Sequence, residues 1–180
     1  MKKILFVLAV MLTMTLTANA QFYAGGSFQL HADKANYEFA ISPEIGYTFQ
    51  SNTAVGCVFD FSYDKGLQRT LGFGVNPYFE YGFLTIGDKF IFYVHTYLHY
   101  NFVSADFLTS ESNFDHNYGI SLNLGVSWGV TDHWSASFDV GGVKYMWNQP
   151  AGKAFKDGTG DFNLGFETNI PFAVALYYNF

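Results

Sequence analysis

The sequence is poor in charge, and it has a single cysteine. Charged residues make up only 13% of the 180 residues, whereas a typical soluble domain carries about 25%. Cys57 has no second cysteine to pair with, so an intramolecular disulfide is excluded. Arg69 is the only arginine and the net charge is −6, which excludes a surface built to neutralise nucleic-acid phosphates. We therefore expect no nucleic-acid partner.

Long hydrophobic runs are also missing after residue 20, where no stretch has the length that a membrane-spanning helix needs. Aromatic residues are nevertheless abundant, at 21% of the chain, with 21 Phe and 13 Tyr. Dispersed hydrophobicity with little charge is typical of strands in which every second residue faces lipid.

The first twenty residues have the composition of a cleavable signal peptide. A short basic region, an apolar run and a small-residue cleavage site follow one another at Lys2-Lys3, residues 4–16 and Ala18-Asn19-Ala20. We predict that residues 1–20 are the signal peptide and that residues 21–180 form one domain, since their length fits a single domain. An uncleaved N-terminal anchor is the alternative, which the cleavage site disfavours.

After Gln21 the dominant period is two, which is the period of a β-strand. Between Tyr118 and Val130, aliphatic and aromatic residues alternate with Gly, Ser and Asn. Pro43 and Pro77 each remove a ladder donor, so irregular pairing is expected at both. The same alternation predicts eight strands, at about 22–31, 37–49, 54–63, 70–83, 90–102, 117–130, 134–147 and 161–180.

The connections between these strands alternate between short and long. Residues 50–53, 85–89 and 131–133 are tight turns, whereas residues 103–116 and 148–160 are longer and polar. Outer-membrane barrels have short periplasmic turns and longer external loops. We therefore expect both mature termini on the periplasmic side.

The two faces of the strands distinguish a membrane barrel from a soluble one. The polar face is mostly Gly, Ser, Asn and Tyr, which suits an enclosed lumen better than a solvated surface. On the apolar face, aliphatic residues lie near mid-strand and aromatic residues at the ends, which matches the layers of a bilayer. The aromatic residues at the predicted periplasmic interface include Tyr47, Phe49, Tyr81, Phe83, Trp128, Trp134 and Tyr178. Because unpaired backbone groups are costly in hydrocarbon, we predict a closed eight-stranded antiparallel up-and-down transmembrane β-barrel.

The alternating strands and the final segment, Phe172-Ala-Val-Ala-Leu-Tyr-Tyr-Asn-Phe180, resemble the small eight-stranded outer-membrane barrels of the OmpX type and the transmembrane domain of OmpA. The resemblance covers roughly residues 21–180 and rests on pattern. It implies location in the outer membrane, contact with outer-membrane lipids and insertion by the barrel-assembly machinery, with Phe180 as the assembly signal. It implies no common activity.

The predicted lumen contains an unusual number of ionisable residues, namely Glu44, Asp60, Glu80, His95, Asp139 and Lys144. Lys144 faces inward if Gly141-Gly142 marks a bulge. Glu44 and Asp60 lie opposite each other or one diagonal step apart, so one hypothesis is a polar plug that binds a proton or a cation. We favour a structural network in which Lys144, Tyr78, Asn123 and water satisfy the acids, because small barrels fill their lumen with side chains.

The five histidines do not form a recognisable metal or catalytic motif. His95 and His99 share a face, but four residues along a strand separate them by about 13 Å, too far for one metal ion. A lipid-modifying site would need a serine, a histidine and an acid together, for example His99 or His116 with Ser104, Ser110 or Ser112 and Asp115. We therefore expect no enzyme, no cofactor and no metal.

Three functions remain open on the sequence. The favoured one is a structural or interaction barrel with a side-chain-filled lumen, whose loops 103–116 and 148–160 face an extracellular partner. The second is an outer-membrane lipid-modifying enzyme of the deacylase or acyltransferase type. The third is a narrow channel, although an eight-stranded lumen is just wide enough to be filled by side chains.

Overall fold

The structure is a computed structural model, and it describes residues 21–32, 37–50, 52–65, 69–87, 89–105, 114–165 and 175–179. The predicted signal peptide, most of the 103–116 loop and Phe180 lie outside these residues. Among the residues described, no helix is long and apolar enough to cross a membrane.

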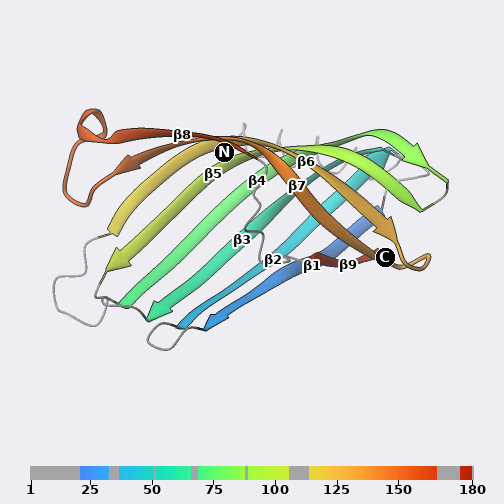
Figure 1. Cartoon of the computed structure of the whole chain (residues 1–180), viewed down its shortest axis with the longest axis horizontal. Helices are drawn as coiled ribbons and strands as arrows, with labels where there is room; N and C mark the ends of the chain where they lie inside the picture. The colour runs from blue at the N-terminus through green and yellow to red at the C-terminus, as the bar shows by residue number, and fades with distance from the viewer. Residues whose placement is uncertain are drawn as a thin grey trace, which may run out of the picture.

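The described chain is built almost entirely from β-strands (Figure 1). The strands are β1 (Gln21–Ala32), β2 (Tyr37–Gln50), β3 (Thr53–Lys65), β4 (Arg69–Ile86), β5 (Phe90–Ala105), β6 (Phe114–Gly129), β7 (Trp134–Gln149), β8 (Thr159–Gly165) and β9 (Ala175–Asn179), and a short 3-10 helix, η1 (Phe155–Asp157), precedes β8. For β1 to β7 the predicted boundaries differ from these by at most three residues. The period-two pattern therefore located the strands well.

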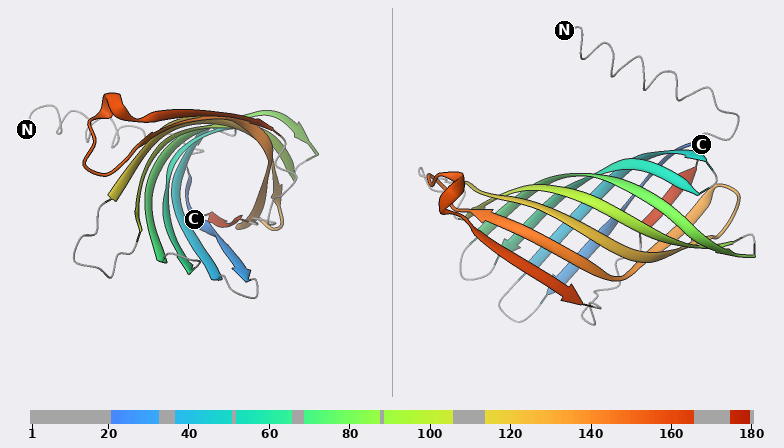
Figure 2. Two further views of the ribbon diagram at one scale, coloured as in Figure 1. Left: turned by 60° about the vertical axis from the view of Figure 1, so that its left-hand side comes forward. Right: turned by 90° about the horizontal axis from the view of Figure 1, so that it is seen from above.

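The strands pair antiparallel with their chain neighbours, from β1–β2 to β7–β8, and curve into a ring (Figure 2). β9 closes the ring, because it pairs with β1 on one side and with the start of β7 on the other. Tyr23 lies opposite Asn179, so both ends of the described chain are at the same end of the barrel. This arrangement confirms the predicted closed up-and-down antiparallel barrel.

The predicted last strand is represented by two segments, β8 and β9. On β7, Gly142 pairs with Gly165 of β8, whereas Ser137 pairs with Ala175 of β9. Between these two pairs β7 advances by five residues and the last part of the chain by ten. The two segments therefore have different registers on β7, and residues 166–174, the middle of the strand predicted for 161–180, lie outside the described residues.

The two strand prolines interrupt pairing locally, as predicted. The β2–β3 ladder has no pair at Pro43, and the β4–β5 ladder has none at Pro77. The register is the same before and after each interruption, because a proline removes one amide donor without adding a residue.

An inserted residue in β7 sets the orientation of its second half. Leu124 pairs with Gly141 and Gly125 with Asp139, so Val140 is the extra residue. This bulge lies one position before the predicted glycine pair. It places Asp139 and Lys144 on the same, inward face although their numbers differ in parity.

The distribution of apolar and polar residues is the reverse of that in a soluble protein. Leu164 is 74% exposed and Phe162 is 66% exposed on the outer face, whereas Glu44, Asn76 and His95 are buried inside. Fully buried polar side chains are rare in soluble cores unless they are paired. An apolar outer surface is what a barrel surrounded by hydrocarbon requires.

Candidate functional site

Five inward-facing tyrosines fill the middle of the barrel, and we call them the tyrosine layer: Tyr23, Tyr78, Tyr93, Tyr97 and Tyr177. Four of them lie directly opposite a glycine of the neighbouring strand, in the pairs Tyr23–Gly46, Tyr78–Gly56, Tyr93–Gly125 and Tyr177–Gly25. A Cβ atom at any of these four glycines would overlap the tyrosine opposite. The glycines therefore leave the space that the tyrosine rings occupy.

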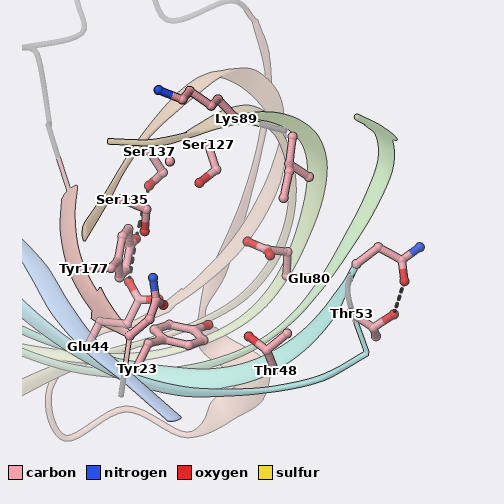
Figure 3. Close-up of a pocket in the computed structure, with 14 residues that line it drawn as sticks. Tyr23, Glu44, Thr48, Thr53, Glu80, Lys89, Ser127, Ser135, Ser137 and Tyr177 are labelled. Carbon is pink, nitrogen blue, oxygen red and sulfur yellow. Dashed lines mark hydrogen bonds between the residues drawn. The ribbon is translucent and has the colours of Figure 1, made fainter. Parts of the chain in front are cut away.

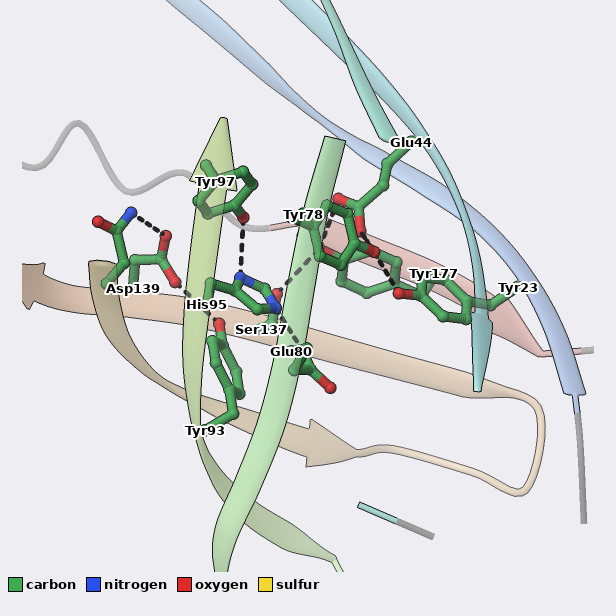
Figure 4. Close-up of polar contacts among 11 residues, drawn as sticks. Tyr23, Glu44, Tyr78, Glu80, Tyr93, His95, Tyr97, Ser137, Asp139 and Tyr177 are labelled. Atoms are coloured by element: carbon green, nitrogen blue, oxygen red, sulfur yellow. Dashed lines mark hydrogen bonds and ion pairs between the residues drawn. The ribbon is translucent and has the colours of Figure 1, made fainter. Parts of the chain in front are cut away.

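Glu44 of β2 is held by the hydroxyl groups of the tyrosine layer (Figure 4). Tyr78 donates to Oε1 of Glu44, and Tyr177 donates to its Oε2 at 3.0 Å. The hydroxyl of Tyr23 in turn contacts that of Tyr78. A buried carboxylate needs such donors because it has lost its hydration shell.

His95 of β5 pairs with Glu80 of β4 and lies among three tyrosine rings. Its Nε2 is 2.5 Å from Oε2 of Glu80, and its Nδ1 is 2.8 Å from the hydroxyl of Tyr97. Because an ionised carboxylate only accepts, Nε2 donates, and in the neutral imidazole Nδ1 accepts from Tyr97. Ring centroids of Tyr78 and Tyr93 lie 5.0 Å and 4.3 Å from that of His95. The imidazole of His95 therefore links Tyr78, Tyr93 and Tyr97 within the tyrosine layer.

Asp139 of β7 completes this layer on the opposite wall. Its Oδ1 accepts from the hydroxyl of Tyr93 at 3.0 Å, and its Oδ2 accepts from Nδ2 of Asn123 at 3.2 Å. The lumen is thus filled at this depth by side chains that satisfy one another.

Nearer to the end where residues 150–158 lie, a second network runs from Asp60 to Ser121. Nδ2 of Asn76 donates to Oδ2 of Asp60 at 2.5 Å, which turns Oδ1 of Asn76 toward His99 at 3.0 Å. Nδ1 of His99 therefore carries the proton, and its Nε2 accepts from the Ser121 hydroxyl at 2.8 Å. This chain of bonds has the hydrogen-bond order of a serine, a base and an orienting group.

Lys144 does not form the ion pair with a lumen carboxylate that we expected from the sequence. It lies opposite Ser121 and Asn163 on the neighbouring strands and forms no ion pair with any described residue. Asn76 pairs with Asp60 instead. Glu44 and Asp60 are one diagonal step apart, since Glu44 lies opposite Val58, and they do not share a partner.

Sequence reasoning named the acids and, among their partners, Tyr78 and Asn123, but it missed Asn76, Tyr93 and Tyr177. Asn76 and the tyrosines of the layer, except Tyr78, were not singled out. A usable signal was present, because each of these tyrosines has the inward parity of its strand. Matching a tyrosine to its opposite glycine needs the strand register, which the sequence does not give.

A cavity of about 210 Å³ lies on the other side of the tyrosine layer, toward the end where the two termini meet (Figure 3). Tyr23, Glu44 and Tyr177 form its floor, Glu80 points into it, and Lys89 and several hydroxyl groups line its walls. The floor separates this cavity from the Asp60–Ser121 network above.

Among the described residues, the catalytic grouping named from the sequence is not formed. His116 faces outward and contacts Tyr100, with its Nδ1 3.4 Å from the tyrosine hydroxyl. His99 has Ser121 as its serine neighbour, whereas Ser104 is fully buried with no hydrogen-bond partner among the described residues. Ser110 and Ser112 lie outside the described residues. The described part of the chain also has no group of three or more His, Cys, Asp or Glu that could hold a metal ion.

The predicted interface aromatics lie at the end of the barrel where the termini meet. Tyr47 contacts Phe22 and Phe49, Trp128 stacks on Phe90, and Trp134 contacts Tyr178 at 5.2 Å. Tyr81 and Phe83 are about half exposed on the outer face, at 48% and 52%. Phe83 is the extra residue of a bulge, because Gly82 pairs with Tyr93 and Leu84 with Phe92.

No known family model matches this chain, and no curated protein matches it in sequence. Among solved structures it is similar to Neisserial surface protein A (NspA), with a TM-score of 0.54 and 15% identity over 89% of this chain and 95% of that one. A match to the N-terminal β-barrel domain of Pseudomonas aeruginosa OprF has a TM-score of 0.48 and 12% identity over 90% of this chain and 98% of that one. Identities this low compare folds and nothing more. With its closed ring of strands and its likeness to NspA, the chain has the fold of the small outer-membrane β-barrels.

Proposed function

We propose that this protein is an integral outer-membrane β-barrel with a structural or interaction role, and that it is neither an enzyme nor a channel. The tyrosine layer is the observation that carries this proposal. Tyr78, Tyr93, His95 and Glu44 are all at most 6% exposed in the middle of the barrel, which supports a lumen filled by side chains at this depth.

Electrical recording in planar lipid bilayers tests the closed lumen. The folded mature protein should give no stepwise current, because a solute would have to displace hydrogen-bonded rings. A Tyr78→Ala/Tyr93→Ala variant serves as the matched control, since it removes two rings of the layer and should admit small ions. Stable single-channel steps from the unchanged protein would overturn the proposal.

The proposed orientation puts both termini in the periplasm and the β7–β8 connection outside. Two turn glycines offer matched sites for an epitope, since Gly87 and Gly152 both have positive φ and open space around them. On intact cells an antibody should reach a tag after Gly152 but not one after Gly87. The reverse pattern would show that the barrel has the opposite orientation in the membrane.

Assembly and contacts follow from the same proposal. We infer that the barrel-assembly machinery inserts the chain, that Phe180 contributes to the signal it reads, and that outer-membrane lipids cover the apolar face. Replacing Phe180 with Ser should lower the amount of folded protein in the outer membrane. The loops 103–116 and 148–160 are the proposed sites of contact with an external partner.

A lipid-modifying hydrolase is the second candidate, and the Ser121–His99–Asn76 geometry favours it. In such a reaction the Ser121 oxygen would attack an ester carbonyl, and His99 would pass the serine proton to the leaving alcohol before water released the acyl group. Ser121 is only 3% exposed, however, so an ester has no evident access to it. We therefore rank this function below the structural one.

A serine-directed fluorophosphonate probe separates the two candidates. The structural proposal expects no labelling, and it expects lipid A of unchanged mass in cells that produce the protein. Labelling that disappears in both Ser121→Ala and His99→Ala would support the hydrolase. Labelling that persists in Ser121→Ala would come from another residue and would exclude the Ser121–His99 site.

A further inference from the structure

The loop of residues 150–158 lies against the outer wall of the barrel and does not cover its mouth. Phe155 of η1 packs edge-on against Tyr118, with ring centroids 5.7 Å apart, and its ring lies tilted against that of Trp147, at 5.4 Å. Tyr118 and Trp147 lie opposite each other on β6 and β7, on the same face as the exposed Ile120 and Tyr145. The loop is therefore folded toward the membrane side.

Hydrogen bonds fix the loop in this position. Nε1 of Trp147 donates to the carbonyl of Phe155 at 3.1 Å, and the amide of Ala151 donates to Asp115 of β6 at 2.7 Å. The side chain of Gln149 donates to the carbonyl of Lys153 at 2.7 Å. Figures 1 and 2 show this segment at the end of the β7–β8 hairpin.

This fixed loop carries two lysines whose charges are not used within the described protein. Lys153 and Lys156 are exposed and flank the exposed ring of Phe155. Neither forms an ion pair with a described residue. Two nearby acids are already engaged, since Asp115 accepts from Ala151 and Asp161 accepts from Asn148. Asp157 is the one acid within the loop itself.

We propose that Lys153, Phe155 and Lys156 form a binding site for the phosphate-bearing headgroup of a glycolipid in the outer leaflet. This inference rests on the proposed function and deepens it, because it names the partner of the 148–160 loop. An aromatic ring at the interface with a lysine on each side places two positive charges at the height of lipid phosphates. Phe155 anchors the loop in the membrane surface, and the lysines supply the charge.

The position of the loop favours a lipid over a protein or a free phosphate. A loop that reaches over the lumen would meet molecules from solution, whereas this one lies on the surface that lipid covers. Each lysine near an anionic surface contributes roughly 1 kcal/mol, which corresponds to about fivefold in binding. Loss of both should reduce retention of the lipid by about 25-fold.

Native mass spectrometry of the folded full-length mature protein in detergent tests this site. The ligands are bisphosphorylated lipid A, the same lipid after removal of its phosphates, and inorganic phosphate. The test variant is Lys153→Gln/Lys156→Gln. The matched control is Lys65→Gln/Arg69→Gln, which removes two exposed cations from the β3–β4 connection at the same end of the barrel.

The proposal expects phosphorylated lipid A to stay bound to the unchanged protein and to the control, and to be lost from the test variant. Equal losses from test and control would show general charge attraction and overturn the site. Retention of the dephosphorylated lipid at the same level would also overturn it, and so would tighter binding of inorganic phosphate than of the lipid. Phe155→Ala should weaken retention with both lysines in place.

Failure of the proposed function would appear in a different measurement. Each variant is first checked for membrane insertion by alkaline extraction and for folding by heat-dependent gel mobility. If alkali releases the unchanged protein from membranes, the barrel proposal itself fails. If the protein resists extraction and lipid retention does not depend on Lys153 and Lys156, only the headgroup site fails.

Discussion

The inner and outer faces of this barrel are built on different principles. On the inner face each group has a particular neighbour, as in the contact of Tyr93 with Gly125 and in the bonds of Glu44 to Tyr78 and Tyr177. On the outer face residues such as Ile45 and Phe162 are more than half exposed and meet only lipid in the proposed setting. The contribution of an inner residue to stability depends on its exact fit with particular neighbours, whereas that of an outer residue depends on its hydrophobicity.

This difference predicts which substitutions affect stability. Fluid acyl chains adapt to many shapes, so the outer face tolerates exchange among apolar residues. The tyrosine layer has no such freedom, because close-packed side chains respond to a single added or removed atom group. Substitutions on the two faces test this contrast.

Gly125→Ala should have the largest effect. A Cβ at Gly125 would overlap the ring of Tyr93, which is only 1% exposed. Overpacking of this kind typically costs about 1–3 kcal/mol, and we expect the upper end of that range. Urea unfolding of the protein refolded in lipid vesicles measures the loss.

Gly129→Ala is the matched control on the same strand, since the nearest atom to a Cβ there is the Lys89 carbonyl oxygen at 3.7 Å. It should change the free energy of unfolding by less than about 0.5 kcal/mol. Equal effects at the two glycines would show that the tyrosine–glycine pairing is unimportant.

Glu44→Leu should come next, with a loss of about 2 kcal/mol. The hydroxyls of Tyr78 and Tyr177 would lose their acceptor in a buried position, and unpaired buried donors are costly. Glu44→Gln keeps the size and one acceptor oxygen, so it should fold with a loss below about 1 kcal/mol. Collapse of the barrel in Glu44→Gln and Asp60→Asn would instead indicate that the negative charges themselves are required.

The native cysteine reports the orientation of the faces. Cys57 lies opposite Ile45 and Pro77 in the wall of the barrel, with the outward parity of its strand. A nitroxide attached to it should collide more often with dissolved oxygen, which concentrates in lipid, than with a water-soluble nickel chelate. In a Cys57→Ser background, a label at Ser121→Cys should be shielded from lipid. The same preference at both positions would contradict an enclosed inner face.

Phe162→Leu should have the smallest effect. Phe162 is 66% exposed on β8, and leucine offers a similar apolar surface to lipid. We expect a change below about 0.5 kcal/mol in the same vesicle assay. A loss as large as that of Gly125→Ala would mean that the outer face has specific partners.

The strand boundaries and the two faces were determined by the sequence, because the period of two is a local property that each strand carries by itself. Pro43 and Pro77 predicted the interruptions of the ladder for the same reason, since a missing amide donor is visible in the sequence. The inward orientation of the acids was also predicted, from the alternation of residues within each strand.

Register, and everything that depends on it, was decided by the tertiary structure. Which tyrosine covers which glycine, why Asn76 and not Lys144 pairs with Asp60, and where the bulges at Phe83 and Val140 lie all follow from strand pairing. The outward fold of the 150–158 loop depends on Tyr118 and Trp147, which come together only through the β6–β7 pairing. A chain specifies its alternation residue by residue, but contacts between strands exist only once the sheet has closed.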